Sequence, residues 1–442
     1  MIQYKMRYRT SVKISTNSEL MKLINAKCQI VHLSTKVCPT FREIRGLSSL
    51  ESLNMYHIQL THVSTELISL PWLKRLNLSC NRLKSVPSQL GSLSFLKELN
   101  LANNELSSIP SELGSLPSLE ILNLSRNNLS SIPSELGLLS SLRTLNVRGN
   151  NLKFIPAELG YISSLQKLGL GDNLLTSIPA ELGFLSSLET LDLNNNKLTS
   201  IPPELGSLSL LEILDLQSNR LISIPSQLGF LSSLKRLDLR FNNITSIPTE
   251  LCSLSLLEIL DVCDNSLTFI PSEIGFLSSL KRLHLLSNKL TSIPSELGSL
   301  SSLRTLTLSE NKLRSIPCEL GSLSSLEVLE LDRNELTSIP CELSCLSSLR
   351  KLSLCSNKLT SIPSKLGSLS QLKKLYLSHN KLRSIPPQLG SLSSLRILIL
   401  TKNKLTSIPA KLKSLSSLET LYLFHNKLTC KPTLSPNVIV YM

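Results

Sequence analysis

Side chains that could do chemistry recur in this sequence every 23 residues, and their type changes along the chain. The position of Asn77 reappears as Asn100, Asn123, Asn146, Gly169, Asp192, Asp215, Asp238, Asp261, His284, Thr307, Glu330, Ser353, Tyr376, Ile399 and Tyr422. The series starts with asparagines, continues with aspartates and ends with aromatic and apolar residues. A row of this kind predicts a surface that binds another molecule, since catalysis needs a few groups gathered in one place.

The second zone holds four carboxylates, each one repeat apart: Asp192, Asp215, Asp238 and Asp261. Carboxylates in line at about 5 Å would repel one another unless cations lie between them. Arg236 and Arg240 flank Asp238, and Lys197 and Arg220 follow neighbouring segments, so a charge lattice within the surface is one interpretation. The other interpretation is a docking strip for a basic segment of a partner.

The third zone is apolar and lies in a strongly basic part of the chain. Its central residues are Tyr376, Ile399, Tyr422, Phe424 and His425, and a lysine recurs nearby as Lys358, Lys381, Lys404 and Lys427. Exposed aromatic side chains beside cations are typical of protein-binding hot spots. The alternative is that the C-terminal cap packs against these apolar residues.

Enzymatic activity and cofactors are not expected. The six histidines are scattered, and none pairs with a nucleophile: His32, His57, His62, His284, His379 and His425. Gly169-Leu170-Gly171 lacks the third glycine and the strand-turn-helix context of a nucleotide-binding loop. No histidine accompanies the cysteines at the spacing of metal ligands. We therefore predict no catalytic, cofactor-binding or metal-binding residues.

The ten cysteines show no paired spacing, which indicates reduced thiols and a cytoplasmic protein. Cys318 and Cys341 are 23 residues apart and Cys345 follows, so a disulfide or a metal pair is the alternative there. The basic start MIQYKMRYRTSVK has no apolar run of secretory length behind it, and no apolar stretch of about 18 residues follows elsewhere. A membrane span is therefore not expected.

The net charge of +14 is unevenly distributed. Residues 349–442 contain fifteen basic residues and one acidic residue, Glu419, whereas residues 50–348 carry a net negative charge. Nucleic acid or an anionic membrane could bind such an end. However, Lys365, Lys411 and Lys413 fall in the other half of the repeat, so the charge surrounds the chain and nucleic-acid binding is not favoured.

The elements that position these residues come from one pattern, LxxLxLxxNxLxxIPxxLGxLxx, which fills residues 73–417 in fifteen copies without insertion. In Leu76-Asn77-Leu78 the alternate leucines point inward and the asparagine outward, as in a short strand. The asparagine after the strand, such as Asn81, is expected to bond backbone groups at the bend. Proline can open a short helical turn in the second half of the repeat, and the glycine of Ser-Glu-Leu-Gly can close it.

LxxLxLxxNxL resembles the leucine-rich repeat signature, and the Ile-Pro-x-x-Leu-Gly half is similar to the intracellular Ras-group class. The resemblance implies an α/β solenoid, a horseshoe with a concave parallel sheet and short helical or 3-10 turns outside. It further implies a non-catalytic scaffold or adaptor in signal transduction, with a small GTPase or signalling enzyme as partner. The alternative is a pathogen-sensing module, or a decoy or effector that recognises other proteins.

The ends depart from the pattern, as the caps of a repeat array must. We expect residues 1–49 to form an N-terminal cap, with a helix after Asn17 and a strand near 29–33. Residues 50–72 are a degenerate repeat with Ile58 in the asparagine position. Residues 418–442 form a final partial repeat and a C-terminal cap, in which Val438-Ile439-Val440 covers the last repeat.

Overall fold

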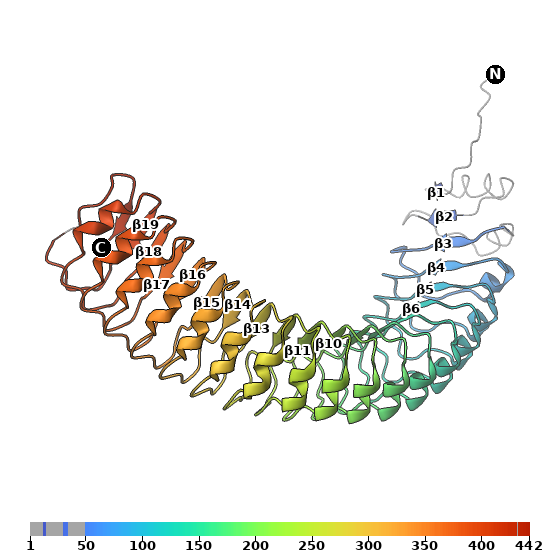
Figure 1. The fold of residues 1–442 in the computed structure, drawn as a ribbon. Helices are drawn as coiled ribbons and strands as arrows, with labels where there is room; N and C mark the ends of the chain where they lie inside the picture. Colours follow the sequence, from blue (N-terminus) through green and yellow to red (C-terminus); the bar gives the residue numbers. More distant parts are fainter. Residues whose placement is uncertain (1–11, 15–29, 34–48, 431) are drawn as a thin grey trace, which may run out of the picture. The chain divides into compact units, whose positions relative to one another are not determined.

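The computed structural model describes residues 12–14, 30–33, 49–430 and 432–442, so the helix expected after Asn17 lies outside the described residues. The chain divides into two compact units, Met1–Asp215 and Leu216–Met442. In each unit, strands of three or four residues lie side by side on one face and 3-10 turns stack on the opposite face (Figure 1). This arrangement confirms the expected solenoid of parallel strands and short turns.

The described strands of the first unit pair in parallel, each with the next in the chain. They are β1 (Val12–Ile14), β2 (Ile30–Leu33), β3 (Ser52–Asn54), β4 (Arg75–Asn77), β5 (Glu98–Asn100), β6 (Ile121–Asn123), β7 (Thr144–Asn146), β8 (Lys167–Gly169), β9 (Thr190–Asp192) and β10 (Ile213–Asp215). The strand expected near 29–33 is therefore present as β2. Strand β1, which no sequence pattern indicated, pairs with it.

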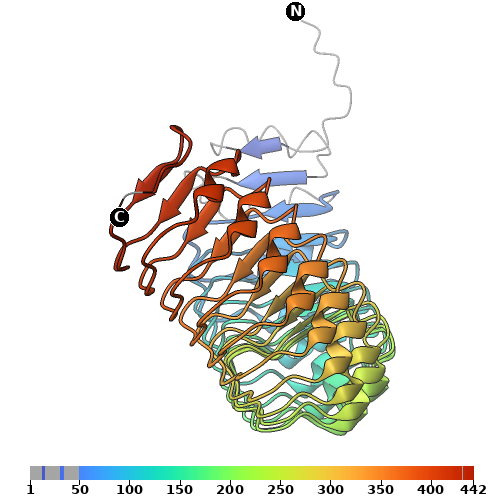
Figure 2. The same cartoon turned by 60° about the vertical axis from the view of Figure 1, so that its left-hand side comes forward.

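The second unit repeats this arrangement, and Figure 2 shows its strands side by side toward the C-terminus. Its strands are β11 (Arg236–Asp238), β12 (Ile259–Asp261), β13 (Arg282–His284), β14 (Thr305–Thr307), β15 (Val328–Glu330), β16 (Lys351–Ser353), β17 (Lys374–Tyr376), β18 (Ile397–Ile399), β19 (Thr420–Tyr422) and β20 (Ile439–Tyr441). The C-terminal segment thus joins the sheet through β20, which pairs in parallel with β19.

A five-residue 3-10 turn follows most strands. In the first unit these turns are η1 (Thr65–Ser69), η2 (Ser88–Ser92), η3 (Ser111–Ser115), η4 (Ser134–Leu138), η5 (Ala157–Tyr161), η6 (Ala180–Phe184) and η7 (Pro203–Ser207). In the second unit they are η8 (Ser226–Phe230), η9 (Thr249–Ser253), η10 (Ser272–Phe276), η11 (Ser295–Ser299), η12 (Cys318–Ser322), η13 (Cys341–Cys345), η14 (Ser364–Ser368), η15 (Pro387–Ser391) and η16 (Ala410–Ser414). Proline precedes each turn from η2 onward, as Pro294 precedes η11, where its extended backbone offers a carbonyl to the amide of Leu297.

The expectation that glycine closes the turn is wrong. Gly298 lies inside η11, and Leu300 is the residue that caps it. The glycine is needed because adjacent turns nearly touch: a Cβ on Gly298 would lie 2.3 Å from the carbonyl oxygen of Glu319 in the next turn. Cys252 occupies the same position of its own turn, η9, so this close approach is relaxed in at least one repeat.

Leucines from the strands and turns fill the interior. Leu303, Leu306 and Leu308 of one repeat have no exposed surface, and the equivalent residues of the neighbouring repeats are buried in the same way. Complete burial of one such side chain contributes roughly 1.5–3 kcal/mol. Each repeat can bury these leucines only against its neighbours, which makes stability a property of the stack.

The repeated asparagine has the structural role predicted for it. The side-chain amide of Asn311 donates to the carbonyl of Leu308 in its own repeat (3.1 Å) and to that of Leu285 in the preceding repeat (2.9 Å). Its side-chain oxygen accepts from the amide of Leu290 at 3.0 Å. The residue just before this asparagine has a left-handed backbone, as Glu310 does with a φ of 56°, and this turns the chain out of the strand.

Candidate protein-binding surface

The strands offer three outward positions, and each position forms a column across neighbouring repeats. In β17, Leu375 is buried, while Lys374, Tyr376 and, after the strand, Ser378 lie at or near the surface. The parallel register places Tyr376 opposite Ile399 and Ile399 opposite Tyr422. The sheet therefore brings these three predicted site residues together at the spacing of adjacent strands, about 4.8 Å.

The column continues into the C-terminal strand β20 through Tyr441, which the sequence analysis missed. Tyr441 pairs with Tyr422, and their rings stack at 4.6 Å between centroids with 6° between planes. Phe424 lies 6.3 Å from the Tyr441 ring and is 40% exposed. We call Tyr376, Ile399, Tyr422, Tyr441 and Phe424 the aromatic surface. The C-terminal segment thus contacts Tyr422, as the alternative interpretation expected of a cap, but it does so as an added strand that extends the column.

Lys351, which was not among the predicted residues, lies beside Tyr376 at one end of the aromatic surface. The Nζ atom of Lys351 lies 5.7 Å from the centre of the Tyr376 ring, a cation–π distance, and 2.6 Å from Oε1 of Glu330. Burial alone would lower the pKa of Lys351, but the Glu330 carboxylate has the larger effect, so the pKa is above its ordinary value. Lys374 pairs with Lys351 across the strands and is exposed, so positive charge borders the ring of Tyr376.

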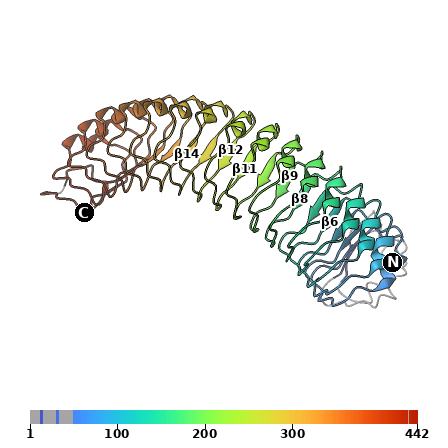
Figure 3. The same ribbon diagram turned by 90° about the horizontal axis from the view of Figure 1, so that it is seen from below.

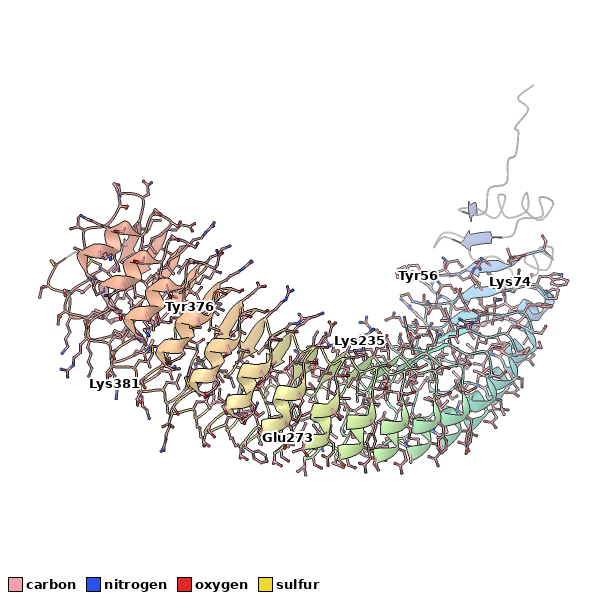
Figure 4. All side chains as sticks on the ribbon, viewed as in Figure 1. Tyr56, Lys74, Lys235, Glu273, Tyr376 and Lys381 are labelled. Atoms are coloured by element: carbon pink, nitrogen blue, oxygen red, sulfur yellow. The ribbon has the colours of Figure 1, made fainter. Side chains whose placement is uncertain are left out.

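The predicted lysine column lies beyond the strands, where each lysine directly follows the repeated asparagine. Its members are all exposed: Lys358, Lys381, Lys404 and Lys427. Lys358 bonds Glu335 at 2.9 Å. Figure 4 shows Lys381 at the outer edge of its repeat, apart from Tyr376. His425 is exposed next to Phe424 and has a left-handed backbone. The lysines add to the local positive potential.

In the first unit, Arg148 neutralises an aspartate two repeats away. Its guanidinium lies 2.8 Å from Oδ2 of Asp192 and 2.7 Å from Oδ2 of Asp172. Burial raises the pKa of Asp192 above its ordinary value, even though Arg148 and the amide of Asn194 oppose that shift. The side chain of Asn194 also donates to Asp215 at 3.2 Å. Gly171 leaves room for the contact between Arg148 and Asp192. A Cβ at this position would lie within 3.0 Å of the side-chain oxygens of Asn194 and Asp192.

In the second unit, Asp238 lies under two arginines. Its carboxylate is 1% exposed and accepts from Arg236 at 3.1 Å and from Arg240 at 2.8 Å. Burial alone would raise the pKa of Asp238, but the hydrogen bonds and charge of Arg240, with Arg236, hold it below the ordinary value. Arg240 also lies 3.4 Å from Asp261. These contacts favour the charge-lattice interpretation of the aspartates over an open docking strip.

The described cysteines are free thiols, among them Cys318, Cys341 and Cys345 on consecutive turns. The described residues include no group of three or more His, Cys, Asp or Glu side chains that could hold a metal ion. His284, in the outward column, bonds Thr307 at 3.1 Å, and burial lowers its pKa. Within the described ranges, no helix is both long enough and apolar enough to cross a membrane.

Thiol reactivity should divide the cysteines by position. Burial, together with the nearby charges of Glu273 and Glu250, raises the pKa of Cys252 to about 12, so its thiol stays protonated up to pH 9. We expect Cys252 to resist alkylation at pH 8 in the folded protein, whereas Cys345 and Cys430, which are exposed, react within minutes. Mass spectrometry after timed iodoacetamide labelling measures this, and equal rates at Cys252 and Cys345 would contradict it.

Comparisons with known proteins agree with this geometry. A family model described as "Leucine-rich repeat region" matches residues 84–197 and 226–351, and one described as "Leucine rich repeat" matches 347–391 and 370–428. No curated protein sequence matches significantly.

Solved structures of leucine-rich repeat proteins resemble the chain over most of its length. One is a leucine-rich repeat protein of Leptospira interrogans, 35% identical with a TM-score of 0.76, over 84% of this chain and 94% of that one. Another is the plant peptide hormone receptor RGFR1 in complex with RGF2, 29% identical, TM-score 0.73, over 95% and 78%. The ectodomain of the Arabidopsis receptor kinase HAESA with an IDA peptide hormone is 30% identical, TM-score 0.67, over 91% and 75%. The chain belongs to the leucine-rich repeat family.

Proposed function

We propose that this chain is a protein-binding scaffold or adaptor that uses the aromatic surface of its second unit to bind an acidic protein segment carrying apolar side chains. The observation that carries the proposal is the continuous row Tyr376, Ile399, Tyr422 and Tyr441 on adjacent strands. Apolar rings that remain partly exposed provide contact area, which a partner can desolvate. The net positive charge of residues 349–442 provides complementarity to acidic residues around the partner's apolar side chains.

The chemistry of the surface supports an acidic partner over nucleic acid. Lys351 and Lys374 border Tyr376, His425 follows Phe424, and the lysine column lies farther out. Lys365, Lys411 and Lys413 are on the turns, on the opposite side of the repeats from the strands. Positive charge that surrounds the repeats attracts acidic proteins but does not line a groove for a phosphate backbone.

We also propose a repeat class, a cellular location and a partner for this chain. The Ile-Pro-x-x-Leu-Gly repeats suggest the Ras-group class, a cytoplasmic role in signal transduction, and a small GTPase or signalling enzyme as partner. The aspartates Asp192, Asp215, Asp238 and Asp261 are secondary candidates for partner contacts. We propose residues 1–49 and 418–442 as caps, with a degenerate repeat at 50–72 and fifteen repeats in 73–417.

A recognition module for peptides or pathogen molecules is the second candidate function. It is favoured by two similar structures, a plant peptide hormone receptor in complex with RGF2 and the HAESA ectodomain in complex with an IDA peptide hormone. Both candidates require a binding surface on the strands, so they differ in the partner and not in the site. The fold does not decide between them.

The test is a variant in which Tyr376, Ile399, Tyr422 and Phe424 are all replaced by serine. We expect it to fold, as judged by circular dichroism, and to lose the proteins that the wild type captures from cytosol. A captured protein is then purified, and its acidic segment is titrated calorimetrically. Loss of several aromatic hot-spot contacts should weaken binding at least about 100-fold.

The matched control changes outward residues of the first unit, with Asn77, Asn100 and Asn123 replaced by serine. These side chains bond backbone groups locally, as Asn100 does with the amide of Ala102. The control should bind like the wild type. If the aromatic variant binds the purified segment as tightly as the wild type, or if the segment binds equally well after its acidic residues are neutralised, the proposal is wrong.

A further inference from the structure

Three consecutive turns of the first unit expose large apolar side chains on the face opposite the strands. Leu138, Tyr161 and Phe184 end η4, η5 and η6, and they are 72%, 63% and 59% exposed. The same position holds serine in η3 and η7, at Ser115 and Ser207. Figure 3 shows the turns of this region stacked in a row beside β6, β8 and β9. We call these three residues the turn ridge.

The turn ridge lies on closely packed turns. The rings of Tyr161 and Phe184 face each other at 6.5 Å with 17° between their planes. The turns that carry them nearly touch, since a Cβ on Gly160 would lie 2.1 Å from the carbonyl oxygen of Glu181. Beneath the ridge, Leu136, Leu159 and Leu182 already fill the core and have no exposed surface. The ridge residues therefore add nothing to core packing that serine would not supply.

A row of carboxylates runs beside the turn ridge. Glu135, Glu158 and Glu181 lie in the first turn of η4, η5 and η6, each three residues before a ridge residue. In a 3-10 helix, residues three apart lie on the same side of the helix, so each glutamate adjoins an apolar side chain. The surface is thus apolar along one line and negatively charged along the next.

We infer that the turn ridge is a second binding surface, which takes a cationic amphipathic segment of a partner protein. Apolar residues of that segment would cover Leu138, Tyr161 and Phe184, and its lysines or arginines would pair with the glutamates. A second copy of this chain fits less well, because packing two ridges together would bring two rows of carboxylates close. An anionic membrane surface would be repelled by the same carboxylates.

The probe is a fluorescent synthetic helix of leucine and lysine, with the lysines on one face, and anisotropy measures its binding to the full chain. Replacing Leu138, Tyr161 and Phe184 together by serine should weaken binding at least about tenfold. That variant should fold, because the neighbouring turns already have serine there. Changing Glu135, Glu158 and Glu181 to glutamine should also weaken binding, most strongly at low ionic strength.

The matched control replaces Phe230 and Phe276, which end η8 and η10 in the second unit with the serine-ending turn η9 between them. It should bind the probe like the wild type, as should the variant of the aromatic surface. The inference is overturned if the ridge variant binds the probe as the wild type does, or if a helix of leucine and glutamate binds equally well. It is also overturned if sedimentation shows a dimer that the serine changes abolish, since the occupant would then be a second copy.

Discussion

Replacing Asn311 by leucine is expected to lower the free energy of unfolding of the second unit by about 3 kcal/mol. Asn311 is buried, and its oxygen is the hydrogen-bond acceptor for the amide of Leu290. Leucine would leave that amide without a partner in an apolar environment. The carbonyls of Leu308 and Leu285 would each lose one of two amide donors, since Asn334 and Asn288 also donate to them. The loss of one asparagine therefore weakens its own repeat and the preceding one.

The matched control is Asn128→Leu, the same change at an exposed asparagine that directly follows the repeated asparagine Asn127. A surface change of this kind should alter stability by less than about 0.5 kcal/mol. Because long repeat arrays depart from two-state unfolding, hydrogen exchange is a better measurement than a single midpoint. Fast exchange should be confined to the repeats around Leu290. Equal exchange in both variants would show that the asparagine bonds contribute little.

The regular parts of the fold could be predicted because one pattern recurs without insertion. Alternation in segments such as Leu76-Asn77-Leu78 predicts a strand, and a fixed period predicts that successive strands lie parallel and in register. The same period predicts that Tyr376, Ile399 and Tyr422 are neighbours. It also identifies Asn81 and its equivalents as residues that bond the backbone at the bend.

Other features depend on side-chain reach and on contacts between turns, which the repeat period does not specify. Strand β20 places Tyr441 beside Tyr422. The two residues are 19 apart in the sequence, so the 23-residue period does not align them. Arg148 reaches an aspartate 44 residues away because its side chain spans two repeats across Gly171. Gly298 was assigned to turn closure on its ordinary preference, whereas close approach of the next turn explains it.

The turn ridge was overlooked for a different reason. Leu138, Tyr161 and Phe184 replace a serine that the pattern treats as variable, and a variable position carries no packing signal. Their exposure became informative only when the structure showed that the core beneath them is complete. A search for apolar residues at positions that are otherwise polar could have found them from the sequence.

Replacing Arg240 by methionine is expected to destabilise the second unit by about 3 kcal/mol at pH 7, because the buried Asp238 would lose both guanidinium bonds of Arg240. It would keep the longer bond from Arg236 (3.1 Å) and a weak bond from the backbone amide of residue 240 (3.3 Å). With Arg240 in place, the pKa of Asp238 is below its ordinary value, so this carboxyl stabilises the fold at neutral pH and loses that contribution as the pH falls. Without Arg240, burial dominates and raises the pKa. The deficit of the variant should therefore be largest near pH 7 and shrink toward pH 4, which urea unfolding at both pH values measures.

The double variant Asp238→Asn/Arg240→Met is the control, since it removes the buried charge together with its partner. It should recover most of the stability lost in Arg240→Met, which would show that the arginine serves mainly to neutralise Asp238. If Arg240→Met is as stable as the wild type at pH 7, the carboxylate is already solvated, and an open docking strip becomes the better interpretation. A buried, paired carboxylate offers little net charge to a partner, so the expected result would leave the aromatic surface as the stronger binding site on the strands of this unit.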